Sequence, residues 1–600
     1  MKKLFAFIIL CTFMLHAATA QTTDKRLAGI DTFINRILSE WKVAGVTVAV
    51  VEKNKVIMTK GYGYKDYENK TPVTENTLFA IGSCTKAFTS SLLSFPLKDG
   101  KLDLDKPVNQ YLPELRFISD ELTNTITTRD MMSHRTGLPR HDLAWYGAKT
   151  SRDSLLYIIR FFETTAPLRQ AWQYNNFMFL AQGVLAQKLS GKTWEELIKE
   201  KLFTPLGMTA SNTSIIDLQK APDFSFGYNE KDGKIMKMKF MNIDALGPAG
   251  SINSNAKDMA NWVMMWINAG KFNGKEIIPA SYYSQAISSQ MVISSGLPSK
   301  EQPDVFFSNY GMAWFLANYR GHYRVEHGGN IDGFSSSTSF FPTDSIGIFV
   351  SVNQNGSPVP SIIRNTIVDK MLGLKFKDWH RTQKVAVDKA KAAAKEKLKA
   401  DSTQHKYGTK PTHSITDYTG TFTNEAYGTL TIELKKDSLI GKYNALTFKI
   451  THYHYDYFNF IPVADGVDAS EDDAMKVLFN INIKGEIESL SVSLQGGVKD
   501  IVFKKKVETI DVSKADLEKY VGDYELPGPT VVKVYIKGDK TLMVLVPGQP
   551  DYEMLPVKKD VFNFKVISGY SVRFEKNDKD EITALYFIQP NGTFKATRKK

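Results

Sequence analysis

The sequence predicts a mixed α/β (α+β) chain: one antiparallel sheet with flanking helices and a helical subdomain, followed by two small all-β domains. β-rich runs at 46–52 and 56–63 are joined by Lys53-Asn54-Lys55, which predicts a hairpin. Strand patterns return between residues 310 and 353 after a long helical middle, and a helical pattern at 360–372 follows them. Strands from both ends of one region, with helices between, predict a single sheet flanked by helices.

The last third of the chain predicts strands only, in two copies of one pattern. The run Y-T-G-T-F at 418–422 resembles Y-V-G-D-Y at 520–524. Further on, E-I-E-S-L at 486–490 resembles E-I-T-A-L at 581–585. Two β-domains of similar build, barrels or sandwiches, are the simplest interpretation.

These patterns divide the chain into five segments. We expect a signal peptide at 1–20, a main domain at 21–375, a basic helical linker at 376–412, and β-domains at 413–507 and 508–600. Within the linker, an Ala- and Lys-rich stretch without Gly or Pro predicts a helix. We favour a solvated helix over a surface that binds the anionic cell envelope, because the basic residues are spread along it. Beyond Trp379 no aromatic residue is interleaved with them along this stretch, so nucleic acid is not an expected partner.

The first twenty residues have the pattern of a secretory signal. Lys2 and Lys3 precede an apolar run at 4–15, and small residues end at Ala20. We therefore expect a periplasmic or secreted protein that begins at Gln21 after cleavage. No later apolar run reaches the roughly 18 to 20 residues that a membrane-spanning helix needs, so no transmembrane anchor is expected.

The cysteine content excludes an intramolecular disulfide in the mature chain. Cleavage would remove Cys11 and leave Cys84 as the remaining thiol, so stability must come from buried apolar cores. The 600 residues, 42% of them hydrophobic, are enough for several such cores.

The run Ser83-Cys84-Thr85-Lys86 is the first candidate for chemistry. A serine hydroxyl is a weak nucleophile and needs a nearby base, together with donors for the oxyanion. If Ser83 begins a helix, Lys86 lies on the same face one turn along. The free N–H groups of that helix start would also face Ser83. Lys86 can act as a base if burial or a neighbouring cation lowers its pKa. Alone, S-x-x-K is weak evidence, since a helix cap followed by a solvated lysine also produces it.

Further motifs follow in a fixed order. Tyr174-Asn175-Asn176 and His327-Gly328-Gly329 stand at the order and spacing of the serine β-lactamases and penicillin-binding proteins. Residues 132–139 resemble the L-S-H-x-S-G-L segment of that group, and residues 248–252 its P-A-G-G-L segment. Over about residues 28–372 the chain thus resembles the branch of class C β-lactamases, D-alanyl-D-alanine carboxypeptidases, D-amino-acid amidases and esterases. The resemblance implies a β-lactamase/transpeptidase-like fold.

The resemblance also implies roles for the motif residues. Ser83 would be the nucleophile and Lys86 would accept its proton. Tyr174 would relay protons to the leaving group and to the deacylating water, and Asn176 would orient Lys86 and the substrate amide. The backbone N–H groups of Ser83 and Asn330 would form the oxyanion hole. No metal or cofactor is implied.

The third motif departs from the K-T-G of many relatives. His327-Gly328-Gly329 lacks both a permanent cation and a hydroxyl that would bind a substrate carboxylate, which disfavours efficient β-lactam turnover. His327 could still donate a hydrogen bond to a carboxylate or to the Tyr174 oxygen, with a charge that depends on pH. The change therefore affects the expected substrate more than the expected acyl-enzyme.

The sequence predicts an exported serine hydrolase that acts through a Ser83 acyl-enzyme on an amide, peptide or ester. A D-amino-acid or peptidoglycan-type peptide is the favoured substrate. A carboxylesterase or a weak β-lactamase is an alternative, as is acyl transfer to an alcohol or amine. From another class, a catalytically silent ligand-binding protein would use the same site for recognition alone. The small-molecule or peptide substrate is the expected partner, and the sequence leaves the oligomeric state open.

Other features have structural interpretations. We expect His134 to hold a loop by hydrogen bonds and Cys84 to be a small buried side chain. His452, His454 and Asp456 alternate, so on one strand they would share a face and could bind a metal. The run that contains them resembles a segment of a β-domain of unassigned function found behind such hydrolases, which favours a structural cluster.

Overall fold

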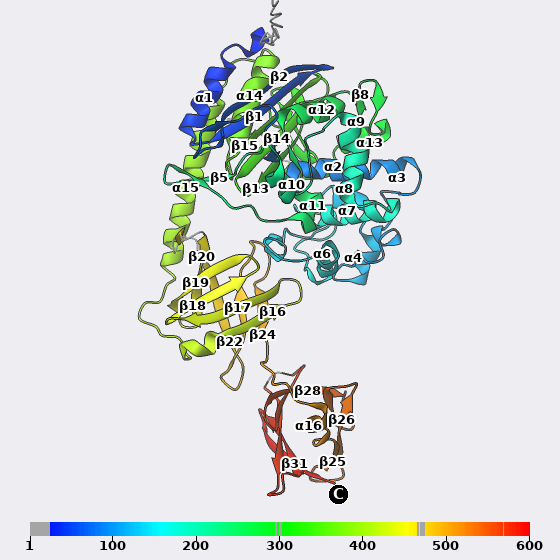
Figure 1. The fold of residues 1–600 in the computed structure, drawn as a ribbon, viewed down its shortest axis with the longest axis vertical. Coiled ribbons are helices and arrows are strands. Elements are labelled where there is room, and N and C mark those ends of the chain that lie inside the picture. The colour runs from blue at the N-terminus through cyan, green and yellow to red at the C-terminus, as the bar shows by residue number, and fades with distance from the viewer. Residues whose placement is uncertain are drawn as a thin grey trace, which may run out of the picture.

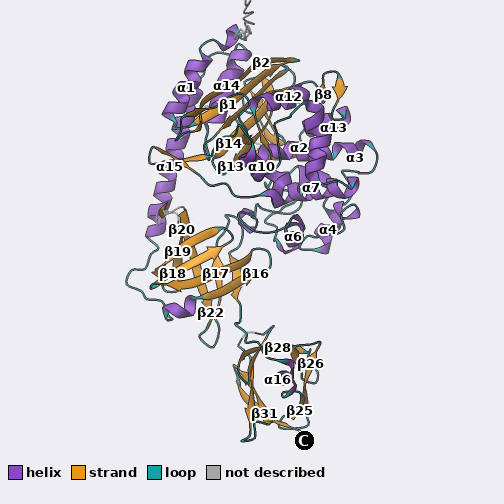
Figure 2. Ribbon diagram, viewed as in Figure 1, coloured by secondary structure: helices purple, strands orange, loops and turns teal. Residues whose placement is uncertain are grey.

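The structure is a computed structural model that describes residues 24–294, 297–298, 303–464, 467–468, 474–567 and 569–599. The predicted signal peptide at 1–20 lies outside these residues. A main domain, a first barrel and a second barrel follow one another along the long axis (Figure 1). Figure 2 shows that most helices belong to the main domain and that the two barrels are almost entirely strands. Within the described part of the chain, no helix combines the length and apolarity needed to cross a membrane.

The main domain is built on one antiparallel sheet of nine strands (Figure 1). They are β1 (Gly45–Glu52), β2 (Lys55–Asp66), β3 (Thr71–Pro72), β10 (Met291–Ser294), β11 (Ser308–Tyr310), β12 (Phe315–Tyr319), β13 (His322–Ile331), β14 (Phe334–Phe341) and β15 (Ile346–Val352). Their order is β10-β11-β12-β13-β14-β15-β1-β2-β3. β1 lies between β15 and β2, with Val46 opposite Val352 and Tyr62. Strands from both ends of the domain therefore meet, which confirms the predicted single sheet and its hairpin.

Helices cover both faces of this sheet. They are α1 (Ile30–Glu40) and α14 (Val359–Met371) on one face and α12 (Ala256–Ile267) on the other. Successive β1 side chains alternate between the faces: Val48 and Val50 pack with α1 and α14, whereas Ala49 and Val51 pack in the cluster of α12. Because both faces are covered, β1 is apolar almost throughout.

A helical subdomain packs beside the sheet around α7 (Phe177–Ser190), which is buried from Phe177 to Ala186. An apolar surface on all sides suits a helix at the centre of a bundle. The other helices of the main domain are α2 (Thr85–Leu92), α3 (Ser94–Lys98), α4 (Asp120–Thr125), α5 (Thr128–Met132), α6 (Arg152–Ile158), α8 (Trp194–Ile198), α9 (Thr204–Leu206), α10 (Ile215–Lys220), α11 (Gly247–Gly250) and α13 (Ala280–Ala286). Short strand pairs are β4 (Phe79–Ala80) with β7 (Asn253–Ser254), β5 (Tyr228–Lys231) with β6 (Lys234–Lys237), and β8 (Lys271–Phe272) with β9 (Lys275–Glu276).

The predicted basic helix forms α15 (Trp379–Ser402), which leads from the main domain to the first barrel (Figure 1). Its first residue anchors it, since the Trp379 indole donates a 2.7 Å hydrogen bond to Asp369 on α14. Most of its following side chains are exposed to solvent.

The first barrel closes because its first and last long strands pair. Its strands are β16 (Gly420–Asn424), β17 (Gly428–Lys435), β18 (Ser438–Tyr443), β19 (Leu446–His454), β20 (Tyr457–Ala464), β22 (Met475–Ile481), β23 (Ile487–Val492) and β24 (Ile501–Lys505), with the short β21 (Val467–Asp468) beside β20. Pairing of β16 with β24 joins the two ends of the domain, and the β19–β20 hairpin completes the ring of eight. The β-domain is thus a barrel, one of the two predicted alternatives.

The second barrel also has eight strands in a closed ring. They are β25 (Gly522–Glu525), β26 (Val531–Lys537), β27 (Thr541–Leu545), β28 (Tyr552–Lys558), β29 (Val561–Phe564), β30 (Ser571–Lys576), β31 (Ile582–Gln589) and β32 (Gly592–Arg598), preceded by the helix α16 (Lys514–Glu518). Its apolar core is a separate cluster, whereas the core of the first barrel is continuous with that of the main domain. The first barrel is therefore the one joined to the main domain by apolar packing.

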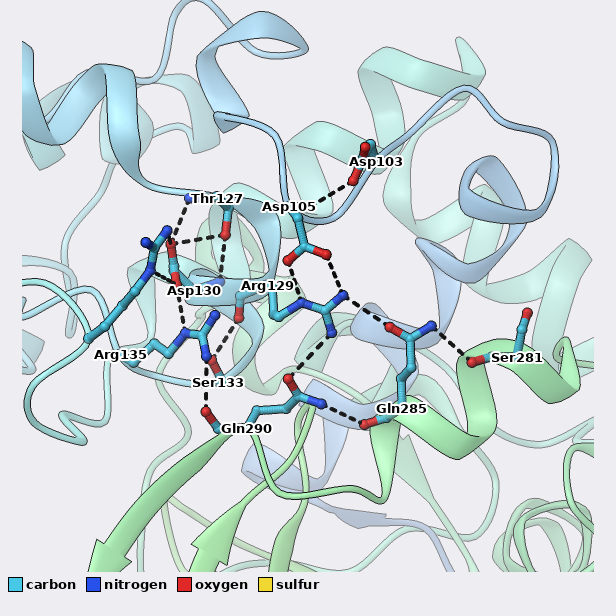
Figure 3. A network of polar contacts seen from close by, with 11 residues as sticks. Asp103, Asp105, Thr127, Arg129, Asp130, Ser133, Arg135, Ser281, Gln285 and Gln290 are labelled. Atoms are coloured by element: carbon cyan, nitrogen blue, oxygen red, sulfur yellow. Dashed lines mark hydrogen bonds and ion pairs between the residues drawn. The ribbon is translucent and has the colours of Figure 1, made fainter.

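A network of ion pairs ties the helical subdomain to the edge of the sheet (Figure 3). The fully buried carboxylate of Asp130 accepts hydrogen bonds from Arg135 (2.6 Å) and Arg169 (2.8 Å). Arg135 also donates to the backbone carbonyl of Gln290, directly before β10 (3.0 Å). These contacts fix the segment after α5, which leads to the motif residues around His134.

Asp130→Ala would leave two arginines without their shared carboxylate, and we expect it to lower the free energy of unfolding by about 2 to 4 kcal/mol. Asp105→Ala is the matched control: its side chain is 62% exposed, and its pair with Arg129 should contribute less than about 1 kcal/mol. Urea unfolding followed by tryptophan fluorescence measures both, because all 8 tryptophans precede the barrels. Equal losses in the two variants would contradict this account.

Candidate active site

Ser83 lies at the start of a helix, as its motif predicts. A 3-10 turn, η2 (Gly82–Cys84), runs directly into α2, so Ser83 and Lys86 share one face one turn apart. Every residue of α2 is buried, and Lys86 is 0% exposed. Ser83 itself is half-buried and opens onto a cavity.

The Lys86 amine has three neighbours at hydrogen-bond distance. Its Nζ lies 2.9 Å from Ser83 Oγ, 2.7 Å from Asn176 Oδ1 and 2.7 Å from the backbone carbonyl of Ala249. The last two are acceptors only, whereas the serine hydroxyl can donate or accept. A neutral amine has two N–H donors and one lone pair. It therefore matches two carbonyl oxygens and a donating hydroxyl.

Electrostatics favour that neutral form. Burial, and secondly the positive charge of Arg140, hold the pKa of Lys86 well below its ordinary value of 10.5, while Asp142 acts in the opposite direction. The neighbouring rings of Tyr174, His134 and His327 supply no permanent charge. Geometry and electrostatics thus favour an unprotonated amine beside the serine hydroxyl, as a general base requires.

Tyr174 lies over the same pair. Its ring centroid is 4.8 Å from Lys86 Nζ and 4.6 Å from Cζ of Arg140. Burial raises the pKa of Tyr174, and a hydrogen bond with Ser83 and the charge of Arg140 offset part of the rise. The phenol therefore keeps its proton at neutral pH and can pass it on.

Asn176 stands at the N-terminal end of α7 and links Lys86 to a residue that the motifs did not indicate. Its Oδ1 accepts from Lys86, and its Nδ2 donates to Asp142 Oδ1 at 2.7 Å. Asp142 also accepts from Trp145 Nε1 (3.0 Å) and Arg140 Nε (2.6 Å). The available signal was a cluster of charged residues directly after the 132–139 segment.

His327 lies on β13 with its ring 1% exposed. Its Nδ1 is 2.6 Å from the carbonyl oxygen of Gly328 and so carries the proton, which leaves Nε2 to accept from the Tyr310 hydroxyl at 3.0 Å. Burial is the largest cause that lowers the pKa of His327, to about 3. The imidazole thus stays neutral around neutral pH and faces Tyr310, another residue that the motifs did not indicate.

Two glycines allow β13 to approach Ser83. A Cβ on Gly329 would lie 1.9 Å from the Ile81 carbonyl oxygen and 3.0 Å from the Ser83 nitrogen. A Cβ on Gly82, whose φ is +52°, would lie 2.8 Å from the Asn330 nitrogen. The backbone nitrogens of Ser83 and Asn330 therefore border the same narrow gap, as the predicted oxyanion hole requires. Gly328 is less constrained, because its nearest neighbour would be 3.5 Å away.

Ser83 lies between two cavities. The larger, of about 910 Å³, is lined by Tyr174 and His327, and the smaller, of about 320 Å³, by Asn176. Ser83, Arg140 and Asn330 border both. A substrate can therefore lie across the nucleophile with one part on each side.

The remaining candidates have structural positions. His134 accepts a hydrogen bond at Nδ1 from the Asn175 backbone (3.1 Å), and buried Cys84 lies 3.2 Å from the His327 carbonyl. In the first barrel, Asp456 accepts from Tyr418 and Thr412.

The two barrel histidines also contact backbone groups. His452 Nε2 lies 2.9 Å from the Tyr455 carbonyl, and His454 Nδ1 accepts from the Lys406 backbone. These partners favour the structural interpretation of the cluster over a metal site.

The fold and this geometry define a class of proteins: hydrolases with a β-lactamase fold, built around a serine and a lysine one helical turn apart. The model of the β-lactamase family matches residues 30–370, and the chain belongs to this family. A second family model, described as a domain of unknown function (DUF3471), matches residues 404–505, which contain the first barrel.

Relatives of known name include the unguisins hydrolase ungD' of Aspergillus campestris, 32% identical over 66% of this chain and 76% of its own length. The protein flp of Staphylococcus aureus is 25% identical over 56% of this chain and 65% of its own length. Among solved structures, the octameric penicillin-binding protein homologue from Pyrococcus abyssi has a TM-score of 0.52. At 20% identity, over 80% of this chain and 100% of the other, it shows a likeness in fold alone.

Gly329→Ala tests the close approach of β13 to the helix start. Because the new methyl group would collide with the Ile81 carbonyl, we expect a loss of about 1 to 3 kcal/mol in stability and a large loss of any Ser83-dependent activity. Gly328→Ala is the matched control and should change both far less. Similar effects of the two substitutions, measured by thermal unfolding and ester hydrolysis, would argue against the proposed oxyanion site.

Proposed function

We propose that this chain is an exported serine hydrolase that cleaves an amide, peptide or ester bond through an acyl-enzyme on Ser83. The observation that carries the proposal is the fully buried Lys86 amine, 2.9 Å from Ser83 Oγ, with its other two contacts on carbonyl oxygens. The contacts of this buried amine suggest no other role for it. Export rests on the pattern of residues 1–20 and gives a periplasmic or secreted enzyme.

In the proposed reaction, Ser83 Oγ attacks the substrate carbonyl carbon while its proton moves to Lys86 Nζ. The N–H groups of Ser83 and Asn330 hold the negative oxygen of the tetrahedral intermediate. Tyr174 gives its phenolic proton to the departing nitrogen or oxygen and regains a proton from Lys86. Water then attacks the acyl-enzyme by the reverse proton path and releases the acid.

The cavities suggest how a substrate is oriented. Tyr174, which would protonate the leaving group, lines the larger cavity, so we assign that cavity to the leaving group and the smaller one to the acyl group. The smaller cavity has mixed walls: Leu143, Trp145, Met238, Ile243, Leu246 and Ile331 supply apolar surface, and Asp142, Asn330, Asp332 and Asn355 supply polar groups. An acyl side chain with an apolar part can contact the apolar side of these walls.

The carboxylates of the smaller cavity are already hydrogen-bonded within the chain. These two carboxylates, Asp142 and Asp332, are both occupied by donors of the chain, and Asp332 accepts from Tyr146 (2.6 Å) and the Met241 backbone (2.7 Å). Because both carboxylates already have partners, neither is reserved for a substrate ammonium, and the cavity does not require a free N-terminal residue.

A peptide is the favoured substrate among the alternatives. The larger cavity is lined by the hydroxyl groups of Ser335, Ser336 and Ser337 and by the Arg140 guanidinium, which suit peptide groups and a terminal carboxylate, while the Arg364 guanidinium there is paired with Glu326. A neutral His327 is a poor substitute for a permanent cation, which disfavours β-lactams. The fungal relative is named a hydrolase of unguisins, which supports hydrolysis as the reaction. By its motifs, a D-amino-acid or peptidoglycan-type peptide is the first substrate to test.

The proposal predicts a covalent adduct on one serine. Intact-mass measurement after treatment with a fluorophosphonate should give one adduct in the wild type and none in Ser83→Ala. Ser83→Ala should also lower kcat for p-nitrophenyl acetate by at least about a thousandfold. Ser361→Ala is the control, because this serine lines the same cavity without contacting Lys86, and it should keep the adduct. A wild type without adduct and without ester hydrolysis would favour a catalytically silent binding protein.

A further inference from the structure

The first barrel holds the loop that runs beneath the active site. This loop, residues 139–147, is contacted by the turn between β18 and β19. Tyr443 Oη donates to the Leu143 carbonyl at 2.8 Å, and Asn444 Nδ2 donates to the carbonyls of Leu143 and Tyr146, both at 3.2 Å. The loop and the turn approach each other closely at Gly147, where an added Cβ would lie 2.9 Å from the Cβ of Ala445.

Apolar and aromatic contacts strengthen the same interface between the first barrel and loop 139–147. The Leu143 side chain borders a small cavity at the end of the barrel core, together with Leu430, Tyr443, Leu446, Phe448, Phe460 and Phe503. His141 stacks on Phe162 at 4.2 Å, and its Nδ1 lies 2.8 Å from the Tyr427 hydroxyl. The loop is thus held by its backbone and by its side chains.

The loop that the first barrel holds is connected to Lys86 by hydrogen bonds. Asp142, directly before Leu143, accepts from Asn176 at 2.7 Å, and Asn176 in turn accepts from Lys86 at 2.7 Å. Two hydrogen bonds therefore separate the loop from the general base. A small shift of the loop would change the distance or direction of both.

The same barrel reaches the other side of the nucleophile. Gln495, in the loop between β23 and β24, lines the larger cavity, where the leaving group would lie. An ion pair between Lys499 and Glu163 (3.6 Å) holds this loop to the main domain. The glutamine amide both donates and accepts, so it can pair with a peptide group of the substrate.

We propose that the first barrel is a working part of the active site. It positions Asp142, and through it Asn176 and Lys86, and it supplies Gln495 to bind the leaving part of a peptide substrate. Asp142, Tyr443 and Asn444 are positioning residues, and Gln495 is a specificity-determining residue. The inference rests on the proposed function in that it assumes hydrolysis at Ser83.

Positioning is tested by the double variant Tyr443→Phe/Asn444→Ala, with Tyr524→Phe as control, since Tyr524 is a buried hydrogen-bonded tyrosine of the second barrel. For p-nitrophenyl acetate we expect the double variant to lower kcat about tenfold with little change in KM, because hydrogen bonds to the loop are lost. The control should keep the wild-type kcat. A lower melting temperature with unchanged kcat would mean that the barrel has a structural role only and would overturn the positioning claim.

Variants of Asp142 add a second measurement, the pH dependence of kcat/KM, which a purely structural role of this residue would leave unchanged. Asp142→Ala removes the carboxylate that opposes Arg140, so the acid limb of the kcat/KM profile should shift to lower pH. Asp142→Asn keeps an oxygen for Asn176 and should retain more activity than Asp142→Ala. An unshifted limb, or equal losses in the two variants, would contradict the assignment.

Gln495 is tested by comparing substrates. Two substrates are compared: a blocked D-alanyl peptide with three residues after the scissile bond, and p-nitrophenyl acetate. We expect Gln495→Ala to lower the ratio of their kcat/KM values, peptide over ester, about fivefold, in keeping with one lost hydrogen bond. An unchanged ratio would overturn this role. If the wild type hydrolyses neither compound, the proposed function itself has failed, whereas an active wild type with unaffected barrel variants refutes only the present inference.

Discussion

The site depends on one buried lysine amine, that of Lys86, which has no carboxylate among its hydrogen-bond partners. Burying an ammonium group costs several kcal/mol unless it is paired or loses its proton. Lys86 is surrounded by carbonyl oxygens and a hydroxyl in place of carboxylates, so its surroundings favour the neutral amine. The same arrangement that makes this lysine unfavourable as a cation makes it suitable as a base.

Other parts of the structure serve to keep that amine in place. The 3-10 turn and α2 present Ser83 and Lys86 on one face, and bare glycine backbone at Gly82 and Gly329 lets β13 close the site from the other side. Asn176 then connects Lys86 to Asp142 and to the loop that lies on the first barrel. The accessory barrel and the base thus belong to one chain of contacts.

Much of this could be predicted from the sequence, for identifiable reasons. The spacing of Ser83 and Lys86 follows from helix periodicity, and the two ends of the main domain carry β patterns that can only meet in one sheet. Asp142 and Tyr310 could not be predicted in the same way. Their roles depend on contacts with Asn176 and His327, which only folding brings close, and the one local sign is the cluster of charged residues that contains Asp142.

The barrels illustrate the same limit. Their strands and their repetition are visible in the sequence, but closure of the first barrel depends on the pairing of β16 with β24, about eighty residues apart, which local patterns do not specify. The tasks of the two barrels also differ despite their similar build. The turn at Asn444 lies on the active-site loop, while the second barrel has a core of its own.

The protonation state of Lys86 tests the account most directly. Its Cε and Nζ resonances, assigned by comparison with Lys86→Arg, can be followed by NMR as a function of pH in protein labelled at lysine. The account predicts a midpoint well below 10.5, so that the amine gains its positive charge only as the pH falls through that lower value. A midpoint at or above 10.5 would mean a permanently charged lysine and would contradict its role as the base.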